Sequence, residues 1–432
     1  MAIDEPTDGD RGGAPAFPPG FIPSRHGASR ARARELVGPL RLLLRGDPEP
    51  SPARWRAIGE GLMRGDPAMD RLVAWMFERG YARARPLFER ALELGIDAVE
   101  DPPEPLRELF ALVDRRPAWL DMDKLEAGAR VMARGGFDYF LVDRDLALMG
   151  GYQASAFNKA LLMTGALEKG ASKRVAETAQ WYLDCTAPGG MRPGGVGFKS
   201  TLRVRLIHAL VRRHLGARPQ WRAAEWGLPV NQTDMAATAL AFPMVMLVGG
   251  RALWVLISGR DADAAMHHGR YVGWLMGVEE AWLPTSEREA LTLLYHLSLS
   301  ITDPDETSVQ LGRALMDEPL QRPYPWPRGL RGRYERARHL SVTRFFLGRQ
   351  AMRNLGLPED TIPWYPLLRA PTNALRHLVA ALIPGGRERL ARRGRQEVLE
   401  VLASMSGPGG ARIGDAFRHL EDGGRRPPPS RA

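Results

Sequence analysis

Apolar side chains in this chain recur at intervals of three and four residues almost from one end to the other. The pattern is clear in three early segments, residues 36–43, 72–76 and 87–94. A period near 3.6 places such residues along one face of an α-helix. The sequence lacks alternating runs of β-branched residues bounded by turns, which would indicate strands. It therefore predicts an all-α protein, built as a single large helical domain.

The two ends of the 432-residue chain differ in composition from the part between them. Residues 1–28 are rich in Gly and Pro and lack helical periodicity, which predicts a disordered or surface-wrapping N-terminal arm. Residues 407–432 include two arginines followed by three prolines, which predicts a disordered Arg/Pro-rich tail. The helical domain is expected to occupy residues 29–406.

Two segments bear on membranes and secretion. The longest uncharged run, residues 235–250, contains Pro243 and is shorter than the roughly 20 residues of a membrane-spanning helix. It follows the polar residues 231–234, a typical helix start, so it favours a core helix over a transmembrane segment. The first 24 residues carry four acidic residues and lack an apolar core, unlike a signal peptide. A cytoplasmic location is expected.

Charge and cysteine content exclude several classes of function. The formal charge is +10, but only five of the 60 basic residues are lysine. So strong an arginine bias is typical of a GC-rich genome, and it is weak evidence for a nucleic-acid partner. The single cysteine, Cys185, excludes an internal disulfide framework, a cysteine-rich metal site and covalently attached haem.

The histidines leave one candidate metal ligand. None of the nine has Glu or Asp three residues before it, so a di-iron bundle site is excluded, and no His-Glu-x-x-His occurs. His208 lies on an apolar helical stripe with Val204, Ile207, Val211 and Leu215. Two interpretations stay open: a hydrogen-bonded core histidine, which position alone favours, and a proximal haem ligand.

A second polar group lies about thirty residues before His208. Arg174, Glu177, Thr178 and Trp181 occur at i, i+3, i+4 and i+7, so they share one face of a predicted helix. Such an Arg–Glu pair is often a surface ion pair of small energy. The neighbouring Thr and Trp suit a partly buried functional surface equally well, and spacing does not decide between the two.

Together these segments resemble the latex-clearing protein (rubber oxygenase) and MpaB-type oxygenase family. The resemblance extends over about residues 140–300. It rests on the following segments: Arg174 with Thr178, Pro188–Gly190, Arg203–Ala209, Pro229–Thr238 and Arg270–Gly277. Their order, and the 34-residue gap between Arg174 and His208, fit the family pattern.

The resemblance implies a globin-like helical core that holds non-covalent b-type haem. His208 matches the proximal iron ligand of the family, and Arg174 and Thr178 match polar residues of the haem pocket. Glu177 stands where rubber-cleaving members carry a distal lysine. A carboxylate cannot donate hydrogen bonds as the lysine ammonium does, so Glu177 would act as a general base or proton relay instead. Among the basic residues near His208, Arg203 and Arg205 are candidates to bind the haem propionates.

The function implied is that of a haem-dependent oxygenase using O₂. Its substrate would be a hydrophobic, unsaturated or isoprenoid-like molecule that is oxidised or cleaved, and its electron donor stays open. Two alternatives remain: a non-catalytic haem-binding sensor or carrier, which Glu177 in place of lysine favours, and a haem-free helical lipid-binding protein. No nucleic-acid partner is expected, because the basic residues are interspersed with acidic ones and lack an aromatic platform.

Overall fold

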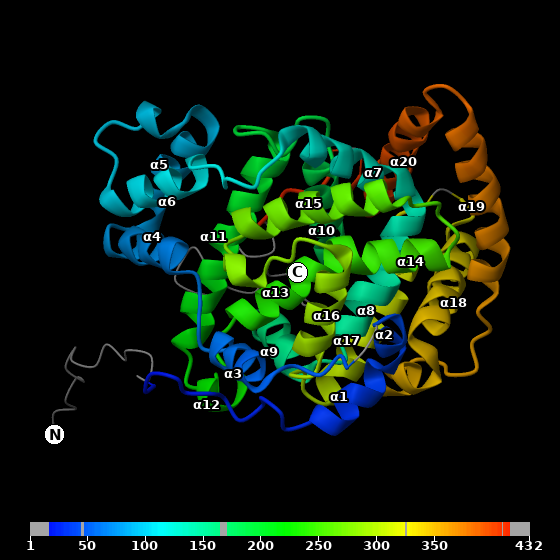
Figure 1. The fold of residues 1–432 in the computed structure, drawn as a ribbon, viewed down its shortest axis with the longest axis horizontal. Coiled ribbons are helices and arrows are strands. Elements are labelled where there is room, and N and C mark those ends of the chain that lie inside the picture. The colour runs from blue at the N-terminus through cyan, green and yellow to red at the C-terminus, as the bar shows by residue number, and fades with distance from the viewer. Residues whose placement is uncertain (1–16, 45–46, 165–170, 325, 408, 415–432) are drawn as a thin grey trace, which may run out of the picture.

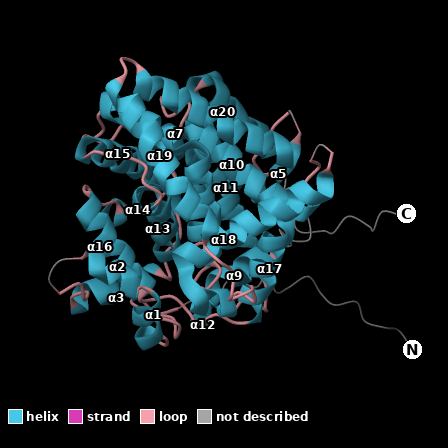
Figure 2. Cartoon of the chain, turned by 90° about the vertical axis from the view of Figure 1, so that its right-hand side faces the viewer, coloured by secondary structure: helices cyan, strands magenta, loops and turns pink. Residues whose placement is uncertain are grey.

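The computed structural model describes residues 17–44, 47–164, 171–324, 326–407 and 409–414. All regular elements in these ranges are helices and none is a strand, as Figure 2 shows. The predicted all-α class is therefore confirmed. The globin-like arrangement of the core stays a prediction.

The helices follow one another with short connections. The first part of the chain forms α1 (Arg30–Leu36), α2 (Gly38–Leu43), α3 (Pro52–Gly61), α4 (Pro67–Glu78), α5 (Tyr81–Leu94), η1 (Ile96–Ala98) and α6 (Glu104–Asp114). The middle forms α7 (Met122–Val142), η2 (Asp143–Leu148), α8 (Met149–Gly151), α9 (Ser155–Met163), α10 (Ala171–Cys185), α11 (Val196–Gly216), α12 (Ala223–Trp226), α13 (Gln232–Leu240), η3 (Ala241–Val245), α14 (Met246–Ala252) and α15 (Gly259–Leu275). The last part forms η4 (Glu280–Trp282), α16 (Glu287–Ser298), α17 (Glu306–Gln321), α18 (Arg328–Asn354), α19 (Trp364–Leu382) and α20 (Gly386–Ser406).

These helices are arranged around α7, α10, α11 and α15, which cross the middle of the molecule (Figure 1). Helices α4, α5 and α6 form one edge, and α18 and α19 lie at the opposite edge. Three large hydrophobic clusters bind the helices together: one under α4–α6, one between α7 and α13–α16, and one among α10, α17, α18 and α20. The residues that resemble the oxygenase family lie in this central layer.

Helix α7 is packed against two partners at backbone distance. A Cβ atom added at Gly128 of α7 would lie 2.2 Å from the carbonyl oxygen of Ala264 in α15. A Cβ atom at Gly394 of α20 would lie 2.1 Å from the carbonyl oxygen of Ala133 in α7. Only glycine permits such an approach, so these two positions fix how α15 and α20 sit on the central helix.

The long uncharged run forms a helix that is interrupted rather than regular. Residues 232–252 comprise α13, the π-helical turn η3 and α14, and Asn231 caps α13 by accepting from the backbone N–H of Asp234. Pro243 lies within η3, where its missing N–H interrupts the α-helical hydrogen bonds. In the described ranges, residues 232–252 are the one stretch long and apolar enough to cross a membrane, by length and composition alone. Half of its most apolar 18-residue window is buried in the protein.

The described parts of both chain ends lie against the helical domain. In the N-terminal arm, Arg25 forms an ion pair of 2.7 Å with Asp234, and the ring of His26 stacks on Trp55. Near the other end, Ile413 packs against the cluster that includes α11. The domain boundaries at residues 28 and 407 stay predictions, and residues 1–16 and 415–432 lie outside the described part of the chain.

The close approach of α20 and α7 leads to a prediction. Gly394→Ala should lower the free energy of unfolding by about 1–3 kcal/mol, because the added methyl group meets a backbone carbonyl that cannot move alone. Gly216→Ala at the end of α11 is the matched control, since no atom lies within 4 Å of its added Cβ. Urea unfolding followed by circular dichroism measures both. Equal stability of the two variants would contradict the packing described.

Candidate functional site

Helices α10 and α11 present the predicted site residues side by side. The Trp181 indole N–H of α10 donates to the Thr201 hydroxyl of α11 at 3.1 Å. Their connection folds back tightly, because the Phe198 N–H donates to the Gly190 carbonyl at 2.9 Å. A Cβ at Gly190 would lie 2.3 Å from the Asp184 carbonyl, so the turn requires glycine there. These contacts set the register that brings the face of Arg174 toward that of His208.

The His208 imidazole is neutral and makes no hydrogen bond within the described part of the chain. Its Nδ1 atom is buried without a partner, and the residue as a whole is half-buried. Desolvation, with the nearby charges of Arg212 and Arg174, lowers the pKa of the ring to about 3. Of the four buried histidines in the described ranges, His268, His296 and His339 each place a ring nitrogen on a protein acceptor, whereas His377, like His208, has a buried ring nitrogen without a partner. His208 therefore differs from a hydrogen-bonded core histidine.

The other three residues of the polar face lie on α10 as the spacing predicts. Glu177 is buried, while Arg174 and Thr178 are half-buried. The Thr178 hydroxyl donates to the carbonyl of Arg174 at 3.3 Å, one turn earlier in the helix. The charge of Arg174 acts on His208 across the two helices. The structure therefore places Arg174 and His208 in one electrostatic environment, with Glu177 buried on the same helix as Arg174.

Asp143 joins this environment, although the sequence analysis did not single it out. It is the first residue of the π-helical turn η2, which continues α7. Desolvation and the charge of Asp145 raise the pKa of its carboxyl to about 7, against the opposing effect of Arg174. No motif marks an aspartate of this kind. Its signal is the Asp-Arg-Asp run at residues 143–145, which lies between the apolar stretches 139–142 and 146–149.

Arg203 and Arg205 bind carboxylates of α5 and of the N-cap of α4. Arg205 is buried and donates to both oxygens of Asp66, at 2.6 and 2.9 Å. Arg203 is half-buried and pairs with Glu89 at 2.8 Å and Glu93 at 2.6 Å. Their predicted role toward haem propionates stays a prediction, and it would require each guanidinium to leave its present partners.

A fully buried polar cluster lies behind Asp143. Asp145 accepts a hydrogen bond from Arg144 at 2.5 Å and contacts Nδ1 of His339 at 2.6 Å. Arg144 also reaches Glu318 at 3.3 Å, which in turn accepts from Arg322 at 2.6 Å. All these charged groups have partners of opposite charge, so the cluster fixes η2 against α17 and α18.

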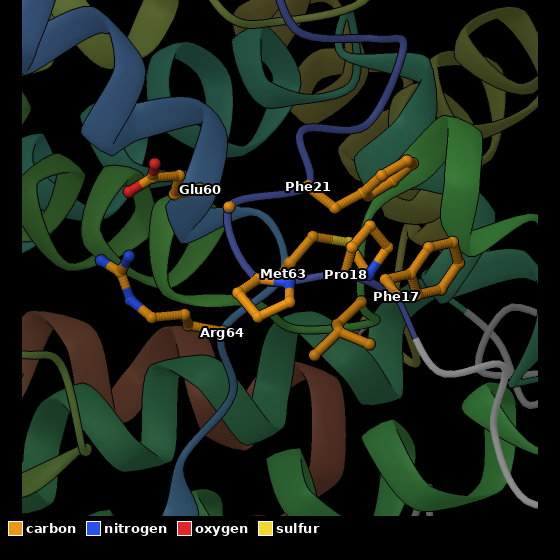
Figure 3. Close-up of a pocket in the computed structure, with 9 residues that line it drawn as sticks. Phe17, Pro18, Phe21, Glu60, Met63 and Arg64 are labelled. Carbon is orange, nitrogen blue, oxygen red and sulfur yellow. The ribbon is translucent and has the colours of Figure 1, made fainter.

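A surface pocket occurs elsewhere in the molecule and contains none of the predicted site residues. Figure 3 shows Phe17, Pro18 and Phe21 of the N-terminal arm facing Met63 and Arg64 after α3. The pocket has a volume of about 470 Å³. Its walls are mostly apolar, and Arg64 forms an ion pair with Glu279 at 2.9 Å. Its other charged group, Glu60, forms an ion pair with Arg56 at 2.8 Å.

Comparison with known proteins defines the class of the chain. Residues 140–382, more than half of the chain, match the family model of the catalytic domain of ER-bound oxygenase mpaB/B' and rubber oxygenase. The chain belongs to this family, as the resemblance predicted. The match contains η2, α10 and α11, and therefore Asp143, Arg174 and His208.

Individual relatives agree with this assignment. A rubber oxygenase from Streptomyces sp. (strain K30) is 24% identical over 188 residues, which cover 43% of this chain and 46% of that protein. The match thus spans about half the length of that relative. A latex clearing protein solved in the closed state has a TM-score of 0.61 and 20% identity, covering 78% of this chain and 91% of the other. The latter likeness shows that the fold is shared.

The contacts of the two arginines lead to a second prediction. Arg205→Met should lower the free energy of unfolding by about 3–5 kcal/mol, because it leaves the buried Asp66 carboxylate without its cation. Arg203→Gln, whose ion pairs are partly exposed, should change it by at most about 1 kcal/mol. Urea unfolding provides the measurement. A fully stable Arg205→Met protein that fails to bind haem would instead support the propionate role.

Proposed function

We propose that this protein is a haem-dependent oxygenase in which His208 is the proximal ligand of a b-type haem. The observation that carries the proposal is the state of His208: a neutral imidazole that makes no hydrogen bond within the described part of the chain, inside the region that matches the oxygenase catalytic domain. Metal ions bind neutral imidazole, so the ring needs no deprotonation at physiological pH.

The residues around His208 fit such a group in most respects. Ile207 and Val204 supply apolar side chains on the same helix face, and Arg174 supplies a cation. Within the described residues, no group of three or more His, Cys, Asp or Glu can form a metal cage, so a prosthetic group suits this site better than a bare ion. One feature departs from the usual pattern, because Nδ1 of His208 lacks the acceptor that commonly orients a ligating imidazole.

Bound haem would supply an iron that binds and activates O₂. The protein residues then handle protons and exclude water. Asp143 can hold or release a proton at its carboxylate near neutral pH, since its pKa is raised to about 7. Arg174 stabilises negative charge near His208 and Asp143. Glu177, a buried carboxylate on the same helix as Arg174, accepts hydrogen bonds where the family pattern carries a lysine donor.

The substrate we propose is a hydrophobic, unsaturated or isoprenoid-like molecule. The support is the family of oxygenases to which the chain belongs, together with the apolar residues that flank His208. Oxygen consumption by the haem-loaded protein with an unsaturated terpenoid separates this proposal from a sensor or carrier. A protein that binds haem but consumes no O₂ under any such condition would favour the carrier.

The ligand role of His208 gives a third prediction. Protein supplemented with haem should show a Soret absorption band, and His208→Ala should lose it, because the single axial nitrogen is removed. His214→Ala is the matched control: it is half-buried on the same helix, six residues later, and should keep the band. Absorption spectra of the folded, haem-supplemented variants measure both effects. If the wild-type protein shows no band, both haem hypotheses are wrong.

The raised pKa of Asp143 gives a fourth prediction. If the carboxylate acts as a base, turnover should rise with pH through about 7, and Asp143→Asn should abolish that dependence while the Soret band remains. Independently of turnover, the folded protein holds this proton more tightly than the unfolded chain, so the stability contributed by the group is lost as pH rises from about 4 to 7. Asp143→Asn should therefore be more stable than wild type at pH 8.

The control for Asp143 is another carboxyl group whose pKa is raised by burial but which lies far from His208. Asp114, at the end of α6, has its pKa raised by desolvation and by the charge of Asp97. Asp114→Asn should leave the pH profile of turnover unchanged. A wild-type profile that is flat around pH 7, or one that persists in Asp143→Asn, would contradict the assignment of Asp143 as the base.

A further inference from the structure

Helix α19 turns a wholly uncharged face toward solvent at the edge of the molecule (Figure 1). Six large apolar side chains on this face are exposed, with Leu375 at 64% and Leu382 at 75% of full exposure. The six are Leu367, Leu368, Leu375, Leu378, Val379 and Leu382. Contiguous apolar surface of this kind marks a contact with a membrane or another molecule.

The charged residues of α19 point inward, opposite to the usual pattern of a surface helix. Arg369 pairs with the buried Asp138 of α7 at 2.8 Å. Arg376 pairs with Glu397 of α20 at 3.2 Å. The helix is thus fixed to the domain by its two cations, and its leucines are left outside.

The apolar face continues onto the loop after α14. The Asn373 side chain of α19 donates to the carbonyl of Leu253 at 3.0 Å, which fixes this loop beside the helix. The next residue, Trp254, is 54% exposed and has φ of +58°, a left-handed conformation that costs free energy for a non-glycine residue. Leu256 is also exposed. An exposed tryptophan beside exposed leucines is typical of a membrane interface.

Basic residues follow this face directly. Residues 362–393 contain six arginines and one acidic residue, Glu388. Four of these arginines are exposed at the start of α20: Arg387, Arg389, Arg392 and Arg393. The surface therefore combines an apolar helix face with a cationic border, which is complementary to the acyl chains and anionic headgroups of a bilayer.

We propose that α19 and the first turns of α20 dock this protein on an anionic phospholipid surface. The leucine face of α19 enters the boundary between headgroups and acyl chains, and the α20 arginines bind lipid phosphates. A second copy of the chain fits this surface less well. Two identical faces would bring the same arginines together, and Glu388 is the one acidic residue in residues 362–393 that could offset their repulsion. The proposal concerns binding alone, so it is independent of haem or turnover.

Co-sedimentation of the full-length protein with vesicles tests the proposal. Wild-type protein should sediment with phosphatidylcholine vesicles that contain phosphatidylglycerol, and much less with phosphatidylcholine alone. The double substitution L375E/L382E should weaken binding by about tenfold or more, because it places two carboxylates in the apolar boundary. Arg387→Gln with Arg392→Gln should weaken binding to the anionic vesicles only, and added salt should do the same.

The matched control is Leu94→Glu. Leu94 is 70% exposed at the end of α5, at the opposite edge of the molecule, and should tolerate the charge without loss of binding. Circular dichroism verifies that all variants are folded. Failure of wild type to sediment, or equal binding to both vesicle types, overturns the proposal. So does a wild-type dimer in sedimentation equilibrium that L375E/L382E converts to a monomer, because the face would then be covered by a second copy.

Discussion

Removal of water from ionisable side chains is the constraint on which the interior of this helical domain depends. Arg144 is fully buried on η2, and its guanidinium is stabilised by Asp145, by Glu318 and by the carbonyl of Leu315. Glu318 in turn accepts from Arg322. Removing one member would leave another charge buried without compensation, at a cost of several kcal/mol. The cluster therefore fixes the position of η2, and with it the position of Asp143.

Removal of water also sets the protonation of the candidate site, where Asp143 and His208 are desolvated without hydrogen-bond partners in the described ranges. Asp143 and Arg144 are neighbours on one π-helical turn, yet Asp143 makes no hydrogen bond in the described part of the chain, and the charge of Arg174 only partly offsets its desolvation and the repulsion from Asp145. Its pKa rises to about 7, so it exchanges a proton at neutral pH. His208, also without a hydrogen-bond partner, stays neutral. Burial raises the pKa of both Asp143 and Asp145 to about 7, but Asp145 is held by Arg144 and His339, whereas Asp143 has no hydrogen-bond partner in the described part of the chain.

The sequence predicted what depends on helical periodicity and did not predict what depends on partners in space. Its period of three and four identified the all-α class and the face shared by Arg174, Glu177 and Thr178, and the polar residues 231–234 identified the start of α13. Periodicity shows which way a side chain points, but not which helix lies opposite. For that reason the carboxylates that bind Arg203 and Arg205 could not be foreseen.

Two further features lay beyond the sequence for the same reason. The sequence predicts a core helix at residues 235–250, whereas the structure has a π turn at Pro243 and a helix whose most apolar window is only half buried. The leucines of α19 look like a core face by their spacing, and only the inward ion pairs of Arg369 and Arg376 show that this face is the outer one.

The proposed lipid contact of α19 and the proposed hydrophobic substrate of the site are connected. The family match ends at residue 382, which is also the last residue of α19, so the leucine face belongs to the catalytic domain and the arginine border of α20 follows it. A hydrophobic substrate of the kind proposed concentrates in lipid rather than in water. A domain that docks on an anionic bilayer by its own edge helix would meet such a substrate where its concentration is highest. On this view, the exposed leucines of α19 would position the protein at the lipid surface.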